Sequence, residues 1–138
     1  MRLTELRGKW VVLSFLPKAM SATCTAQACA LQEAHEEFLA MGAEVLCAGP
    51  DDAVRQRLFR ESHELAFPLL IDRDAKLASR YGVFRERRTG GRSYAGMVRA
   101  TFLIDPSGRI SQLWDNLRVK GHVPRVLDRL REELDELA

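Results

Sequence analysis

Two cysteines five residues apart, Cys24 and Cys29, are the side chains of this sequence best suited to carry chemistry. They follow a dense apolar run, residues 10–16, and lie at the start of a segment with helical periodicity. A thiol at such a strand-to-helix junction lies where unpaired helix amides point, and these amides stabilise an anion. The position therefore indicates thiol chemistry, with Cys24 as the first candidate.

Cys24 is expected in the first turn of its helix. If Ser21 caps this helix, Cys24 is about its third residue. Amide donors and the helix dipole lower a thiol pKa there from about 8.5 to about 3.5–7.5, which makes the nucleophilic thiolate available at neutral pH. The alternative is a buried structural cysteine on the apolar stripe that Cys24 shares with Ala28 and Leu31. The spacing alone does not separate these two interpretations.

Cys29 is expected on an accessible face, because its helical neighbours Gln32, Glu33 and Glu36 are all polar. Five residues of helix give a rise of roughly 7.5 Å and a rotation of about 140°, so the two cysteine Cα atoms would lie roughly 8–9 Å apart. A disulfide needs less than about 7 Å. The two thiols can therefore join only if the helix unwinds locally, which predicts one conformation for attack and another for bridging.

Arg99 is the third candidate. It lies within residues 97–104, which are mostly apolar, so a central strand is expected there. A buried guanidinium needs an anionic partner, because an unpaired buried charge is costly. That partner could be a thiolate or a carboxylate such as Asp72 or Asp105, and the sequence leaves both open.

The remaining thiol and the histidines carry weaker signals. Cys47 lies in an apolar, strand-like segment, residues 44–48, and is expected in the core. His35 shares the apolar stripe of the Cys24 helix and is expected to pack or to face the surface. His63 and His122 have no recognisable motif around them.

The composition is that of one globular domain, residues 1–138. Twenty-one basic residues against nineteen acidic ones give a net charge of +2, which provides no electrostatic argument for nucleic acid or an anionic membrane. The densest basic run, residues 85–92, is expected to be a solvated loop. Three cysteines, with no signal peptide or membrane-spanning run, favour a reducing, cytoplasmic location. The sequence leaves a monomer and a weak dimer open.

The order of apolar segments predicts an α/β fold with a mixed central sheet flanked by helices. The expected strands are residues 10–16, 44–48, 67–71, 98–104 and 110–114, the last two joined by a type I turn at 105–108. One long helix is expected over residues 22–41. A second helix, capped by Asp51 or Asp52, should have Val54, Leu58 and Leu65 near one face. A third helix should be capped by Asp72 or Asp74, and a fourth should close the chain.

The site pattern resembles that of the peroxiredoxins. Pro17, Ser21 and Cys24 stand in the order of the family's proline, threonine or serine, and cysteine motif. The positions of Cys29, five residues after Cys24, and of Arg99, just before residues 101–105, are similar to those in the bacterioferritin comigratory protein branch, also called peroxiredoxin Q. The resemblance continues along nearly the whole chain. It implies a thioredoxin-like fold and a thiol peroxidase that needs no metal or organic cofactor.

The resemblance also implies roles for these residues. Cys24 would be the peroxidatic cysteine, which attacks hydrogen peroxide or an organic hydroperoxide and becomes a sulfenic acid. Cys29 would be the resolving cysteine, forming a disulfide that thioredoxin or a similar dithiol reduces. Ser21 would hydrogen-bond the thiolate and the peroxide, Pro17 would shield the thiolate from water, and Arg99 would hold the anion and the developing charge.

Two departures from the family pattern stand out. The family normally has an N-terminal hairpin before the stretch matched by residues 3–9, so either the true start lies upstream or, as expected here, this form lacks the hairpin. Ala22 and Thr23 also stand where the branch usually has proline and glycine, which loosens the turn before Cys24 but leaves the reacting groups in place.

Two other functions are weighed against the peroxidase. A soft-metal-binding module could use Cys24, Cys29 and His35, although modules of this kind on the same fold have three residues between their cysteines and here there are four. A redox-inactive or chaperone-like domain would follow if the short N-terminus disables the site.

Overall fold

A five-stranded mixed sheet organises the protein, whose computed structural model describes residues 3–115 and 118–137. The strands run in the order β3-β2-β1-β6-β7. Their bounds are β1 Trp10–Phe15, β2 Ala43–Gly49, β3 Leu69–Ile71, β6 Ala100–Ile104 and β7 Ile110–Trp114. The first three pair in parallel, and β6 and β7 join antiparallel. The predicted mixed sheet is confirmed.

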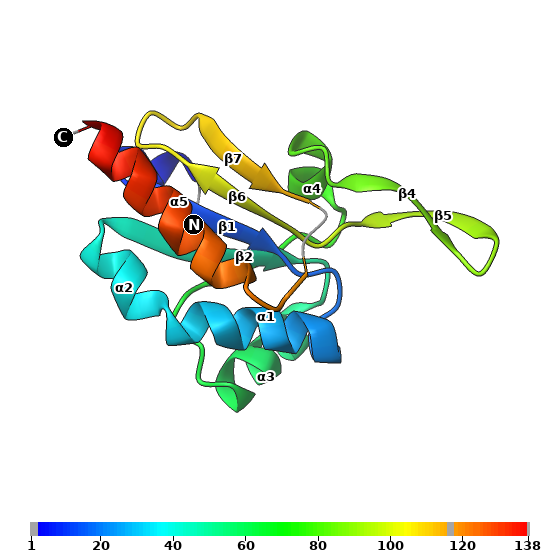
Figure 1. Cartoon of the computed structure of the whole chain (residues 1–138). Helices are drawn as coiled ribbons and strands as arrows, with labels where there is room; N and C mark the ends of the chain where they lie inside the picture. Colours follow the sequence, from blue (N-terminus) through cyan, green and yellow to red (C-terminus); the bar gives the residue numbers. More distant parts are fainter. Residues whose placement is uncertain (1–2, 116–117, 138) are drawn as a thin grey trace.

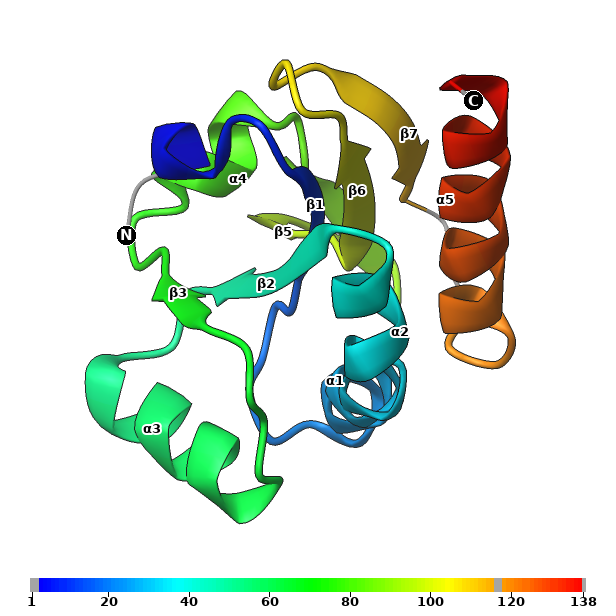
Figure 2. The ribbon, with the colours of Figure 1, turned by 90° about the vertical axis from the view of Figure 1, so that its left-hand side faces the viewer.

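Helices cover both faces of this sheet (Figures 1 and 2). One face carries α1 (Ala22–Glu33), α2 (His35–Ala40) and α5 (His122–Leu137), which share one apolar core with the sheet. The short helix α4 (Lys76–Arg80) and the 3-10 turn η1 (Leu3–Leu6) lie over the other face. Helix α3 (Ala53–Ser62) packs beside β3 at the edge of the sheet.

The single helix predicted over residues 22–41 is wrong, because the chain breaks at Ala34 into α1 and α2. The backbone amide of Ala34 still bonds to the carbonyl of Ala30, and α2 then begins at His35. After the break, α2 packs on β2 with Phe38 fully buried. Two short helices therefore fit this face of the sheet where the periodicity indicated one.

The buried face of α3 also differs from the prediction. Val54 and Leu58 are 75% and 52% exposed, and the side chains that α3 buries are Gln56 and Phe59. Leu65 is buried but lies beyond the end of the helix. The large Phe59 ring packs into the core, whereas the smaller side chains of Val54 and Leu58 remain exposed.

The basic run predicted as a loop forms a two-stranded antiparallel ribbon instead. Strands β4 (Phe84–Thr89) and β5 (Arg92–Met97) project from the body of the molecule (Figure 1). Gly90 and Gly91 have φ values of 59° and 79°, the positive values that a two-residue hairpin turn requires. Arg85 and Arg92 are exposed, as a solvated run demands.

The type I turn predicted at residues 105–108 is confirmed. The Gly108 amide donates to the Asp105 carbonyl oxygen at 2.9 Å. The Asp105 carboxylate accepts from the side chain and amide of Ser107 and from the Arg109 amide, which hold its pKa below the usual value. This turn joins β6 and β7 as an antiparallel hairpin.

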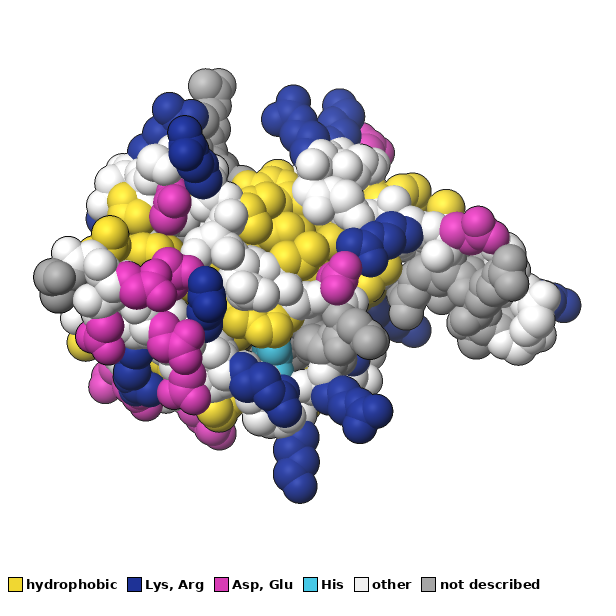
Figure 3. Space-filling model, turned by 45° about the horizontal axis from the view of Figure 1, so that its top comes forward, with side chains coloured by type: hydrophobic (Ala, Val, Ile, Leu, Met, Phe, Trp, Pro, Cys, Tyr) yellow, Lys and Arg dark blue, Asp and Glu magenta, His cyan; other side chains and the backbone are white. Residues whose placement is uncertain are grey.

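The surface carries charges of both signs. In Figure 3, acidic side chains gather on one side of the visible face, and basic side chains are scattered over the rest. Within the described part of the chain, no helix has the length and apolar character to cross a membrane.

Candidate active site

Cys24 lies in the first turn of α1, under the cap that the sequence predicted. Ser21 has an extended backbone, and its Oγ accepts a hydrogen bond from the Cys24 amide at 3.2 Å. Helix α1 begins at Ala22, so Cys24 is its third residue. The cap and the helical position are confirmed, and the thiol is almost fully buried on the sheet side of α1.

The loop that leads to Cys24 is fastened to the end of β2. The Leu16 amide donates to Ala48 at 2.8 Å, and the Ala19 amide donates to the carboxylate of Asp51 at 2.7 Å. Gly49 is required for this approach, since a methyl group there would lie 2.6 Å from the Leu16 carbonyl oxygen. Half-buried Pro17 is held in this loop, between β1 and the helix cap.

Arg99 lies outside the strand predicted for it, in the short connection before β6. Because Phe15 pairs with Ala100, Arg99 lies at the same end of the sheet as the loop to Cys24. Its Nη1 atom is buried and has no hydrogen-bond partner within the described residues.

The two carboxylates proposed as alternative partners of Arg99 are engaged elsewhere. Asp72 accepts from the amides of Leu77 and Ala78 at the start of α4, and Asp105 organises its own turn. Among residues 3–115 and 118–137, neither forms an ion pair with Arg99. The geometry therefore leaves this guanidinium available to another anion.

A buried chain of polar side chains, missed by the sequence analysis, joins α1 to α5 through the sheet. The Gln27 amide donates to Ser14, Ser14 bonds to Thr101 at 2.8 Å, and His122 Nε2 bonds to Thr101 at 2.9 Å. These four residues are at most 1% exposed. The signal available in the sequence was Ser14 and Thr101, each a polar residue inside an otherwise apolar strand, β1 and β6. The chain fixes the sheet-facing side of α1 one turn after Cys24.

His122 is held neutral in this chain. Burial, followed by the nearby guanidinium groups of Arg125 and Arg99, lowers its pKa from 6.5 to about 4. Its ring also packs edge-on against Trp114, with the centroids 6.0 Å apart. At neutral pH the interior around Ser14 and Thr101 therefore contains an uncharged imidazole.

Cys47 lies next to this chain, because its position on β2 pairs with Ser14 on β1. The side chain is 1% exposed, so the predicted core location is confirmed. Burial, and to a smaller extent the neighbouring Cys24, raise the pKa of the Cys47 thiol well above its usual range. The Cys47 thiol therefore stays protonated at neutral pH and is a poor nucleophile.

Cys29 lies further along the same helix as Cys24, and both thiols are free. It is half-buried rather than fully accessible, because the end of α3 approaches it. The Cys29 Sγ atom lies 3.8 Å from Nδ1 of His63, the residue that directly follows α3. No motif joins these two residues, which lie 34 positions apart along the chain.

The three-residue metal site considered as an alternative does not form. His35 is half-buried and packs its ring against Phe67, with the centroids 5.8 Å apart. Over the described residues, no three or more His, Cys, Asp and Glu side chains converge in a way that could hold a metal ion. Cys24, Cys29 and His35 therefore do not form a ligand set in this conformation.

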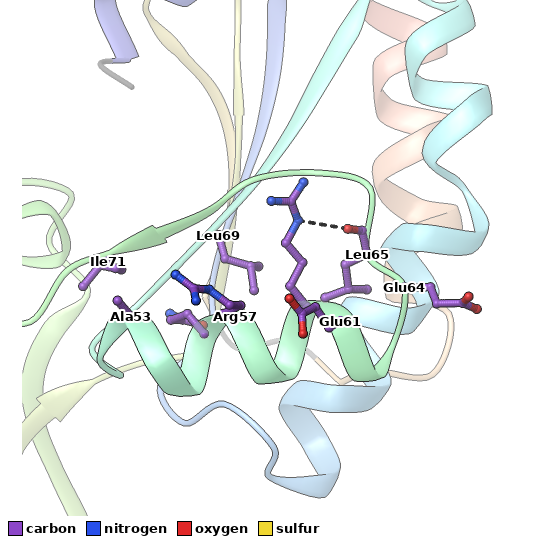
Figure 4. A pocket seen from close by; sticks show the side chains of 9 residues that line it. Ala53, Arg57, Glu61, Glu64, Leu65, Leu69 and Ile71 are labelled. Atoms are coloured by element: carbon purple, nitrogen blue, oxygen red, sulfur yellow. Dashed lines mark hydrogen bonds between the residues drawn. The ribbon is translucent and has the colours of Figure 1, made fainter.

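A pocket lies away from the thiols, between α3 and β3 (Figure 4). It has a volume of about 590 Å³ and is lined by Ala53, Gln56, Arg57, Arg60, Glu61, Glu64, Leu65, Leu69 and Ile71. Arg60 Nε donates to the Leu65 carbonyl oxygen at 3.1 Å across one end of it (Figure 4). None of the predicted site residues lines this pocket, so its size is no guide to the chemistry.

The sequence matches the AhpC/TSA family over residues 1–113. The chain belongs to this family. It is 37% identical over 131 residues to peroxiredoxin Bcp of Bacillus subtilis, spanning 95% of this chain and 83% of that protein. It is 40% identical over 129 residues to the putative peroxiredoxin bcp of Haemophilus influenzae, spanning 94% and 83%.

Solved AhpC/TSA structures give the same assignment. The bacterioferritin comigratory protein of Xanthomonas campestris, studied for alkyl peroxide reduction, superposes with a TM-score of 0.92 at 30% identity, over 96% of this chain and 85% of that chain. Peroxidoxin BcpB from Mycobacterium tuberculosis gives a TM-score of 0.83 at 29% identity, over 96% and 85%. The thioredoxin-like fold and the bacterioferritin comigratory protein branch are therefore confirmed.

Proposed function

We propose that Cys24 and Cys29 carry out the thiol-dependent peroxidase reaction of this peroxiredoxin. The Cys24 thiolate attacks the terminal peroxide oxygen, the S–O bond forms as the O–O bond breaks, and water or an alcohol leaves after protonation. The Cys24 sulfenic acid then condenses with Cys29, releasing water and giving a disulfide. A thioredoxin-type dithiol reduces this disulfide and returns both thiols.

The observation that carries the proposal is the cap of α1. Because Ser21 Oγ accepts from the Cys24 amide through a lone pair, its hydroxyl proton remains free to donate to the sulfur or to a peroxide oxygen. The exposed amides of the first helical turn add favourable potential for a thiolate at Cys24.

Arg99 and Pro17 complete the proposed site. The buried Nη1 of Arg99 is a donor without a partner in the described structure, which is what an anion-binding group shows before its anion is bound. A fixed donor of this kind stabilises the charge that develops on the departing peroxide oxygen. Pro17, in the loop fastened to β2, supplies an apolar ring with no amide donor of its own.

The same branch of the family includes a protein studied for alkyl peroxide reduction, which favours organic hydroperoxides beside hydrogen peroxide as substrates here. We place the cycle in the reducing cytoplasm, where free thiols persist and dithiol reductants operate. The proposed state is a monomer or a weak dimer.

The test is to add one equivalent of hydrogen peroxide to the reduced protein and to map the thiols by mass spectrometry, with a Cys24→Ser variant alongside. We expect a Cys24–Cys29 disulfide in the wild type and no oxidation of Cys29 or Cys47 on the same timescale in the variant. The variant should consume peroxide at least about a hundredfold more slowly, since it lacks the nucleophile. If the thiols of the folded, reduced wild type remain unchanged after peroxide is added, the result would contradict the proposal and favour the redox-inactive interpretation.

A further inference from the structure

The contact between Cys29 and His63 connects two parts of the chain that no sequence motif joins. Cys29 Sγ and His63 Nδ1 lie 3.8 Å apart, within the distance of a hydrogen bond to sulfur. If the imidazole carries its proton on Nε2, the Cys29 S–H can donate to Nδ1. This is the arrangement in which an imidazole removes a proton from a thiol.

The His63 ring is held in place by packing. Its edge meets the ring of fully buried Phe59, with the centroids 5.2 Å apart and the planes at 64°. The His63 amide also bonds back to Phe59 at the end of α3. Both Cys29 and His63 are half-buried, so the pair is partly shielded but remains in contact with solvent.

A second bond holds the two segments together beside this contact. Three residues after His63, the Ala66 amide donates to Oε1 of Gln32 at 2.7 Å, and Gln32 lies one turn after Cys29 on α1. Arg60 braces the same connection, because its Nε donates to the Leu65 carbonyl oxygen. The half of α1 that carries Cys29 is therefore anchored to the segment after α3.

This anchoring matters for the disulfide step. A Cys24–Cys29 bond requires the start of α1 to unwind, since five helical residues separate the Cα atoms by roughly 8–9 Å. The cap bond from Cys24 to Ser21 lies at the end that must open. The bonds near Cys29 lie on the other side, so Cys24 can move while Cys29 keeps its contact with His63.

We propose that His63 is the general base that prepares Cys29 to resolve the Cys24 sulfenic acid, an inference that rests on the proposed peroxidase cycle. His63 Nδ1 takes the Cys29 thiol proton, and the thiolate electron pair forms the S–S bond to the Cys24 sulfur. The S–O bond of the sulfenic acid breaks, and the leaving hydroxide recovers the proton from the imidazolium, directly or through solvent. The products are the disulfide, water and neutral His63, and peroxide supplied the oxidising equivalent in the first step.

The test follows the two steps separately. Reduced protein is mixed with one equivalent of hydrogen peroxide and quenched over time with a sulfenic acid reagent and a thiol alkylating reagent, and the products are counted by mass spectrometry. In His63→Ala we expect sulfenic acid to form at the wild-type rate and the disulfide to form roughly tenfold or more slowly. Added imidazole should restore part of the disulfide rate in this variant.

The matched control is His35→Ala, which removes another half-buried histidine that packs on a phenylalanine ring but makes no contact with a thiol among the described residues. This variant should form both products at wild-type rates and should not respond to imidazole. A wild-type disulfide rate in His63→Ala, or a loss of rate that imidazole does not restore, would overturn the role of His63 as a base. If the wild type forms no Cys24 sulfenic acid, or a disulfide with another thiol, the proposed cycle itself fails and the inference fails with it.

Discussion

Two cysteines differ in how a histidine lies near them: Cys29, at the rim of the molecule, touches His63 directly, whereas Cys47, in the interior, lies beside a hydrogen-bond chain that ends at His122. At the rim, half-buried Cys29 touches half-buried His63, whose ring packs on Phe59. In the interior, Cys47 lies in the strand register beside Ser14, whose hydrogen-bond chain continues to His122. The residue types are the same in both places, but the solvent access differs.

The difference decides which of Cys29 and Cys47 is suited to the proposed resolving role. A thiolate loses its hydration when it is fully buried, and burial is the main reason why the pKa of Cys47 is raised and that of His122 is lowered. The interior therefore keeps both groups uncharged. Cys29 retains contact with water and lies directly against an imidazole, so proton transfer is possible there. Burial therefore leaves Cys29 suited to the proposed resolving role and keeps Cys47 protonated in the core.

The largest expected effect comes from removing the rim thiol. Cys29→Ser should lose at least about a hundredfold in peroxide turnover driven by thioredoxin and its reductase. The other remaining thiol, Cys47, is kept protonated by burial and is a poor nucleophile for the sulfenic acid. The first turnover should survive, so one equivalent of peroxide should leave a Cys24 sulfenic acid that a specific reagent traps. Sustained turnover by this variant, or the formation of a Cys24–Cys47 disulfide, would contradict the resolving role of Cys29.

The lowered pKa of the interior histidine, His122, predicts a pH dependence of the free energy of unfolding that tests this contrast. Above about pH 6.5, His122 is neutral in both the folded and the unfolded chain and contributes no pH dependence. Between that pH and about 4, the unfolded chain binds a proton that the folded protein excludes, so the free energy of unfolding falls as the pH is lowered. The difference of about 2.5 pKa units corresponds to a loss of roughly 3 kcal/mol.

Urea unfolding at a series of pH values measures this loss, with His122→Asn as the reference. The variant should show a free energy of unfolding that falls less steeply between pH 6.5 and 4 than that of the wild type. Parallel curves for the two proteins would mean that the interior accepts the charged imidazole, and the contrast with the rim would lose its physical basis.

The features that the sequence predicted well are those encoded locally. The Ser21 cap lies three residues from Cys24, and the Asp105 turn closes within four residues, so each depends on neighbours in the chain. Strands β1 and β6 were recognisable because fully buried strands are almost continuously apolar. These local signals were enough for the mixed sheet and for the position of Cys24 in the first turn of α1.

The features that the sequence did not predict depend on long-range packing. The contact of Cys29 with His63 joins residues 34 positions apart, and the Ser14–Thr101 bond spans 87. Strand β4 of the ribbon is mostly charged, so it lacks the apolar alternation that marks a strand. The paired glycines at the turn before β5 were the available signal. The break at Ala34 carries no glycine or proline that would have marked it in the sequence, and α2 packs on β2 directly after it.

The smallest expected effect tests the interior thiol directly. Cys47→Ala removes one buried sulfur atom, which leaves a small cavity and should lower the free energy of unfolding by about 1 kcal/mol. Peroxide turnover should stay within about twofold of the wild type, because a thiol that remains protonated takes no part in forming the disulfide. Cys29→Ala is the matched variant, since it removes the same atom from a half-buried site. Cys29→Ala should lower the free energy of unfolding by less than Cys47→Ala does, but it should lose nearly all peroxide turnover. If Cys47→Ala instead lost turnover while keeping its stability, the interior thiol would be the reactive partner, and burial would not be what distinguishes the two cysteines.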